Sequence, residues 1–139
     1  MRKLLLVSLL AVAAATGCSK AADPGPATQQ AAGKIATISV DELDQLLAHD
    51  GGQAVDANGD STRKQMGVIP GAVLLTDMDS IGNLPADKAK NLVFYCANPS
   101  CSASHYAAEK ARAAGYAHVK VLPEGIAGWV KAGKKTTSI

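Results

Sequence analysis

Hydrophobic and polar positions along residues 34–139 predict short strands separated by helices. Ser39 and Glu42 form a capping-box pattern, and the apolar positions that follow share one helical face until Gly51 and Gly52 end it. Strands that alternate with helices predict an α/β fold with a parallel sheet covered on both faces. The expected strands cover residues 35–38, 53–57, 73–75, 92–96 and 118–122, and the later helices cover 61–66, 103–114 and a short segment with Ile126 and Trp129.

The amino-terminal part of the chain has a different pattern. Arg2 and Lys3 precede an apolar run, residues 4–15, that is interrupted only by Ser8. A run of this length suits the core of a signal peptide better than a membrane span. The run ends in Ala-Thr-Gly-Cys, which resembles a bacterial lipobox with Cys18 as the lipidated residue. The alternative is an ordinary secretory signal in which Cys18 has no role.

These features predict a chain of three parts. Residues 1–17 are a lipoprotein signal peptide, residues 18–33 are a flexible tether rich in Ala, Pro, Gln and Gly, and residues 34–139 are one domain. We expect the protein to lie at the periplasmic face of the bacterial cell envelope, where lipid on Cys18 anchors it in the membrane. The residue after Cys18 is Ser19 and not Asp, which favours sorting of the lipoprotein to the outer membrane.

The charge of the chain gives no sign of a nucleic-acid partner. The precursor has 14 Lys and Arg against 12 Asp and Glu, and removal of residues 1–17 leaves 12 of each. No run of basic residues is interleaved with aromatic ones. We therefore expect no binding to nucleic acid.

Cys96 is the leading candidate for chemistry. It ends the most apolar expected strand, and a small polar loop separates it from the helix expected at about Ala103. A thiol at such a turn faces backbone N–H groups and a helix amino terminus, both of which favour the thiolate. We therefore expect the pKa of Cys96 to lie below that of an ordinary free thiol. The alternative is a buried structural cysteine.

Three pieces of the chain, in order and at matching spacing, resemble a single rhodanese domain. They are residues 55–58 with Arg63 and residues 67–72, then residues 94–96 with the following loop and helix, and finally residues 115–129. The resemblance implies a five-stranded, mainly parallel sheet flanked by helices. Residues 96–101 form a loop of the six-residue length found in the sulfurtransferase branch, and lack the Arg that ends the longer loop of related phosphatases.

The resemblance also implies the reaction. Cys96 would be the nucleophile of a sulfurtransferase that moves sulfane sulfur from a small donor, such as thiosulfate, to a thiol acceptor through a persulfide. No cofactor and no metal are expected. The loop would bind the substrate, although it contains neither Lys nor Arg and so grips an anion weakly. The expected substrate-binding residues are Ala97, Asn98, Pro99, Ser100 and Cys101.

Three other residues are candidates for support of the site. The family's usual Asp-x-Arg is replaced by Asp56-Ala57-Asn58, so Arg63 is the candidate for the missing cation. A structural ion pair between Asp56 and Arg63 is the alternative. His105, on the first turn of the helix after the loop, is expected either to bind the donor or orient the thiolate, or to be a solvated surface residue.

Cys101 leaves several alternatives open. It could resolve a persulfide or sulfenate on Cys96 by forming a Cys96–Cys101 disulfide, which an oxidising periplasm would favour. It could instead be a small loop residue that faces the core. A metal site made of Cys96, Cys101 and His105 does not follow a known zinc pattern. Two other functions are therefore weighed beside sulfur transfer: a periplasmic thiol–disulfide redox protein using Cys96 and Cys101, and a non-catalytic binding module with the rhodanese fold.

Overall fold

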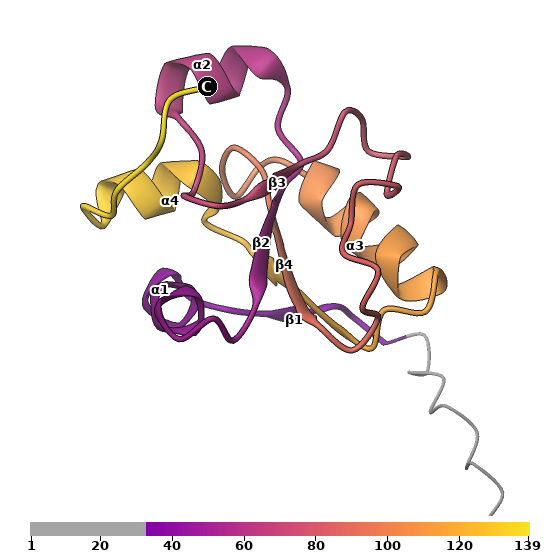
Figure 1. Cartoon of the computed structure of the whole chain (residues 1–139). Coiled ribbons are helices and arrows are strands. Elements are labelled where there is room, and N and C mark those ends of the chain that lie inside the picture. Colours follow the sequence, from indigo (N-terminus) through magenta and orange to yellow (C-terminus); the bar gives the residue numbers. More distant parts are fainter. Residues whose placement is uncertain (1–32) are drawn as a thin grey trace, which may run out of the picture.

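The structure is a computed structural model and describes residues 33–139. The predicted signal peptide, Cys18 and all but the last residue of the predicted tether lie outside the described residues. The described part has a central sheet with helices on both sides (Figure 1). Among its helices, none is long and apolar enough to cross a membrane.

The helices and strands follow the sequence prediction to within one or two residues at each end. Asp56 ends its strand one residue before the expected boundary, and Cys96 lies just after its strand. The elements are β1 Ala36–Thr37, α1 Val40–Ala48, β2 Gln53–Asp56, α2 Asp60–Met66, β3 Val73–Leu74, β4 Asn91–Tyr95, α3 Ala103–Ala113, β5 His118–Leu122 and α4 Gly125–Lys131.

The sheet has five strands in the order β1-β5-β4-β2-β3. All four strand pairs are parallel, so the sheet expected to be mainly parallel is wholly so. Strand β4 lies in the centre, and Tyr95 at its end is in register with Asp56 of β2 and Leu122 of β5. The carboxyl ends of these strands therefore meet at one edge of the sheet, which is where parallel sheets carry their functional residues.

The sheet separates two hydrophobic cores. On one face, Leu92 and Phe94 of β4 pack with the alanines of α3. On the other face, Val93 and Tyr95 pack with side chains of α1 and α4, among them Leu43. Burial on both faces explains why β4 is almost continuously apolar and not alternating.

Specific hydrogen bonds hold the amino-terminal and carboxyl-terminal parts of the domain in place. The Ser39 side chain accepts a hydrogen bond from the Glu42 backbone N–H, and the Glu42 carboxylate accepts one from the Ser39 N–H, so the predicted capping box is confirmed. At the other end, Val68 and Thr137 exchange two backbone hydrogen bonds of 2.9 Å. Trp129 is buried in the core and donates from Nε1 to the Lys135 carbonyl oxygen at 2.8 Å, which ties the carboxyl-terminal segment to α4.

Candidate functional site

Cys96 lies at the carboxyl end of the central strand, between β4 and the loop that leads into α3. Its side chain is 2% exposed, whereas Cys101 at the end of the loop is partly exposed. Both are free cysteines. The loop residues between them are exposed apart from Ala97, which is half-buried.

The Cys96 sulfur has two polar partners at 3.3 Å. One is the Cys101 carbonyl oxygen, and the other is the Ser104 hydroxyl on the first turn of α3. A carbonyl oxygen can only accept, so this contact requires the protonated thiol. The Ser104 hydroxyl can donate to the sulfur and therefore favours the thiolate. The contact with Cys101 therefore favours the protonated thiol of Cys96, and the contact with Ser104 favours its thiolate.

The first turn of α4 holds the start of the loop through two backbone hydrogen bonds. The N–H groups of Ile126 and Ala127 donate to the carbonyl oxygens of Cys96 and Ala97 at 2.8 and 2.9 Å. This close approach requires Gly125, which has φ +62°, because a Cβ there would lie 2.6 Å from the Cys96 oxygen. The carbonyl groups of Cys96 and Ala97 are thus directed toward α4.

The N–H groups of Ala97 in the loop and of Ala103 at the start of α3 act on Cys101. Burial alone raises the pKa of the Cys101 thiol, but hydrogen bonds from Cys96 and from the backbone of Ala97 and Ala103 outweigh it and hold the pKa below its ordinary value. For Cys96, burial raises the pKa, and the hydrogen bond with Cys101 raises it further against the opposing effect of Ser104. The prediction of a lowered pKa for Cys96 is therefore wrong for this arrangement. The main reason is the burial of Cys96, to which the hydrogen bond with Cys101 adds.

Asp56 and Arg63 form a buried ion pair beneath the strand ends. Arg63 Nε lies 3.1 Å from Asp56 Oδ1, and Nη2 donates to the carbonyl oxygens of Asp56 and Leu75 at 3.2 and 2.8 Å. Arg63 is 6% exposed and Asp56 is fully buried. Arg63 is thus committed to holding β2 and the segment after β3, as the structural alternative expected. Nearby, burial raises the pKa of Tyr95, and the charge of Asp56 adds to the effect.

His105 is half-buried on the first turn of α3. Within residues 33–139, no group of three or more His, Cys, Asp or Glu side chains is placed to hold a metal ion. The structure therefore brings Cys96, Cys101 and the loop together with Ser104, and directs the Arg63 guanidinium into the fold.

Ser104 was missed in the sequence. It is 2% exposed and shares the buried face of α3 with Ala107, Ala108 and Ala111. A single hydroxyl at the first position of an otherwise alanine stripe, spaced i, i+3, i+4 and i+7, was the available signal. Because this stripe faces the core beside β4, its first residue lies next to the residue that follows the strand.

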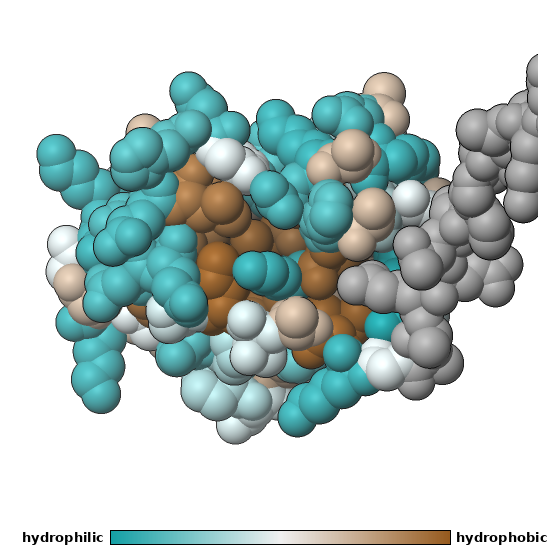
Figure 2. Space-filling view, turned by 90° about the horizontal axis from the view of Figure 1, so that it is seen from below, coloured by the Kyte–Doolittle hydropathy of each residue, from teal (hydrophilic) through white to brown (hydrophobic). Residues whose placement is uncertain are grey.

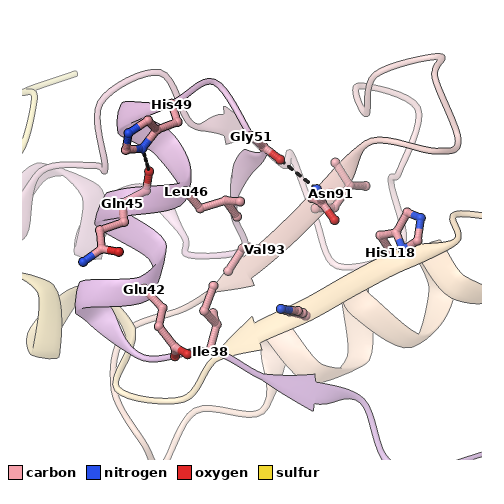
Figure 3. Close-up of a pocket in the computed structure, with 11 residues that line it drawn as sticks. Ile38, Glu42, Gln45, Leu46, His49, Gly51, Asn91, Val93 and His118 are labelled. Atoms are coloured by element: carbon pink, nitrogen blue, oxygen red, sulfur yellow. Dashed lines mark hydrogen bonds between the residues drawn. The ribbon is translucent and has the colours of Figure 1, made fainter.

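A pocket of about 380 Å³ lies at the opposite edge of the sheet, between α1 and the amino ends of β4 and β5. Figure 3 shows Leu46 and Val93 among its apolar lining, with His49 and His118 on either side. The lower face of the molecule has a brown hydrophobic centre bordered by hydrophilic residues (Figure 2). This pocket contains neither described cysteine, so Cys96 and Cys101 lie at the other edge of the sheet.

Comparisons with known proteins agree with this architecture. A rhodanese-like domain protein from Staphylococcus aureus is 29% identical over 75% of this chain and all of its own, with a TM-score of 0.60. A Bacillus halodurans protein is 24% identical over 74% of this chain and 77% of its own, with a TM-score of 0.65. The human single-domain sulfurtransferase TSTD1 is 22% identical over 68% of this chain and 95% of its own, with a TM-score of 0.58.

At this identity the Bacillus and human structures establish a shared fold. A search of curated proteins finds no match. The model of the rhodanese-like domain, however, matches residues 39–132, which run from the cap of α1 to the end of α4. The chain therefore belongs to the rhodanese-like domain family.

Proposed function

We propose that the chain is a sulfurtransferase that moves sulfane sulfur from a donor such as thiosulfate to a thiol acceptor, with Cys96 carrying the sulfur as a persulfide. The observation that carries the proposal is the placement of the Cys96 sulfur. It lies at the carboxyl end of β4, 3.3 Å from the Ser104 hydroxyl and inside the loop that opens α3. Its burial favours a small donor.

The nucleophile forms by a short proton transfer within the cysteine pair. The Cys96 thiol donates a hydrogen bond to the Cys101 carbonyl oxygen. The pKa of Cys96 is raised and that of Cys101 is lowered, so Cys101 is the thiolate of the pair and can accept the Cys96 proton. When the proton passes to Cys101, Cys96 becomes the thiolate and Ser104 donates to its sulfur. Cys96 then attacks the outer sulfur of thiosulfate, the sulfur–sulfur bond of the donor breaks, and sulfite leaves with the bonding electron pair.

The persulfide on Cys96 is an anion that must be held until an acceptor arrives. The Ser104 backbone N–H and hydroxyl both act on the Cys96 sulfur. An incoming thiolate then attacks the outer sulfur and restores Cys96. Preorganised donors of this kind are each worth about 2–4 kcal/mol where they meet developing charge.

Turnover measured with two cysteine variants tests the proposal. The full chain is given thiosulfate and a monothiol acceptor, and the release of sulfite is followed. We expect Cys96→Ser to abolish turnover and Cys101→Ser to slow it without abolishing it, since Cys101 is the base and Cys96 the carrier. The matched control is Ser102→Ala, because Ser102 is exposed and makes no side-chain cap hydrogen bond. Sulfite release by a folded Cys96→Ser chain would contradict the proposal.

We also propose that the chain is anchored by lipid on Cys18 at the periplasmic face of the cell envelope, in the outer membrane. The support is the sequence: an apolar run of signal-peptide length ends at Ala-Thr-Gly-Cys, and Ser19 follows. Acyl labelling of cells that express the full chain tests this. Cys18→Ser should remove the label, and labelling that persists in this variant would contradict the proposal.

A further inference from the structure

We propose that Cys101 is an internal acceptor: its sulfur attacks the Cys96 persulfide, hydrosulfide leaves, and a Cys96–Cys101 disulfide remains. This inference rests on the proposed sulfurtransferase function, because it requires the persulfide. It makes the chain a thiosulfate reductase in each turnover that Cys101 intercepts, in addition to a carrier that hands sulfur to an external thiol.

The geometry of the loop brings the two cysteines together. The Cys96 thiol donates to the carbonyl oxygen of Cys101 at 3.3 Å, and the Cys101 side chain is near enough to contribute to the raised pKa of Cys96. A turn returns the chain toward Cys96, because the Cys101 N–H donates to the Asn98 carbonyl oxygen at 3.0 Å. The Asn98 side chain supports the same turn through the Ser100 N–H at 2.9 Å. Cys101 is therefore folded back onto Cys96 and is partly exposed.

The surroundings of Cys101 are those of a reactive thiol. Backbone N–H groups of Ala97 and Ala103 act on its sulfur from both ends of the loop. Such groups stabilise the negative charge that a sulfur carries when it attacks. A cysteine that only filled space in the core would not need these donors. The partly exposed Cys101 also lies where a reductant can reach the pair.

The step balances in atoms and electrons. After sulfite has left, Cys96 carries an anionic outer sulfur and Cys101 holds the proton that it took from Cys96. The outer sulfur first takes the Cys101 proton, which leaves Cys101 as the thiolate. The Cys101 sulfur then bonds to the inner sulfur on Cys96, the bond between the inner and outer sulfurs breaks, and the outer sulfur leaves as hydrosulfide with the bonding electron pair. The two cysteine thiols are oxidised to a disulfide, and the sulfane sulfur is reduced.

The next turnover requires a dithiol reductant, which reduces the disulfide and is itself oxidised. The complete cycle then converts thiosulfate and a dithiol into sulfite, hydrosulfide, a proton and an oxidised dithiol. A monothiol acceptor that reaches the persulfide before Cys101 attacks would instead carry the sulfur away intact. The choice between reduction and transfer is thus a competition between Cys101 and the external thiol for one persulfide.

A single turnover without any external thiol tests the inference. The full chain is reduced, freed of reductant, kept free of oxygen and mixed with thiosulfate, and sulfite and hydrosulfide are measured. The protein is alkylated and digested with trypsin. Residues 91–110 contain no internal Lys or Arg before Lys110, so one peptide holds both cysteines, and Cys18 falls in another. We expect equal amounts of sulfite and hydrosulfide, and a peptide two hydrogens lighter that has taken no alkyl group.

Cys101→Ser and Cys101→Ala separate the two steps. Both variants lack the Cys101 base and should release sulfite more slowly than the unchanged chain. They should nevertheless retain the extra sulfur and reduce hydrosulfide to background. If the unchanged chain releases sulfite but keeps its persulfide, the inference fails and the proposed function stands. A disulfide that forms without hydrosulfide also overturns the inference, since another oxidant would then be responsible. If no chain releases sulfite or gains sulfur, the proposed function fails and the inference fails with it.

Discussion

Replacing Ser104 with Ala removes the hydroxyl that lies 3.3 Å from the Cys96 sulfur. Ser104 is 2% exposed on the buried face of α3, and Ala matches the residues that continue that face. The substitution therefore removes one hydrogen-bond donor and leaves the packing of the helix in place. Ser104 acts as a positioning residue, because it acts on the Cys96 sulfur and does not itself react.

The size of the effect follows from the charge on sulfur. A hydrogen bond to a charged group contributes about 1.5–3 kcal/mol, which corresponds to a rate change of about 10- to 150-fold. Sulfur is a weak acceptor, so we expect the lower end, a loss of about 10-fold in the rate of Cys96 attack. Burial and the Cys101 contact raise the pKa of Cys96, and the Ser104 hydroxyl is the main group that lowers it. Removal of this hydroxyl should therefore raise the pKa of Cys96 further.

The assay is the rate of sulfite release in a single turnover with thiosulfate, measured as a function of pH. The rate follows the fraction of chains in which Cys96 is ionised. Ser104→Ala should lower that fraction while the cysteine pair still holds one proton, and the difference between the two proteins should narrow at higher pH, where both thiols are ionised. Ser104→Thr keeps a hydroxyl and should restore most of the rate. Ser102→Ala, with an exposed side chain at the same helix terminus, should leave the rate and the profile unchanged.

Two results would refute this reasoning. An unchanged rate in Ser104→Ala would show that the hydroxyl does not assist the sulfur. A rate that is lowered equally at every pH would show that Ser104 only supports the shape of the loop.

Three further substitutions test other contacts. Gly125→Ala should lower Tm and the rate of sulfite release, because its Cβ would meet main-chain atoms of the loop. The control is Gly71→Ala, since Gly71 has a similar φ of +75° but nothing within 4 Å of its Cβ position. Equal effects of the two substitutions would refute a role of the Gly125 contact. Arg63→Ala should lower the free energy of unfolding in urea by about 3–5 kcal/mol, since Asp56 becomes a buried unpaired charge; a loss below about 1 kcal/mol would mark the pair as no stronger than a surface one. Ser100→Arg should lower KM for thiosulfate several-fold by adding a bidentate cation to a loop that has none, and an unchanged KM would place the anion elsewhere.

The fold was predictable because its signals are local. The capping box at Ser39 and the apolar run of β4 each depend on neighbouring residues, and each was confirmed. The first helix ends at Ala48, before the predicted glycines, and Asp50 has the positive φ that follows it. The order of the strands was not readable in this way. It follows from which faces pack together, and the placement of β4 between β2 and β5 comes from the structure alone.

The location of the site was predictable from the sequence, but the hydrogen bonds within it were not. The pattern of strand, loop and helix located Cys96 at the end of β4. It could not reveal that Ser104 faces the sulfur, or that Ala97 and Ala103 direct their N–H groups at Cys101. Those contacts depend on the path of six residues of loop, which α4 fixes from a distant part of the sequence. The lower pKa was assigned to the wrong cysteine for this reason and because Cys96 is buried.

The most direct test of the central claim is the location of sulfur after a single turnover. The Cys101→Ala chain is treated with thiosulfate, alkylated and digested, and the peptide of residues 91–110 is fragmented in a mass spectrometer. We expect one additional sulfur, carried by residue 96, in proportion to the sulfite released. A peptide without additional sulfur in a chain that has released sulfite would contradict the account, because Cys96 would then not be the carrier.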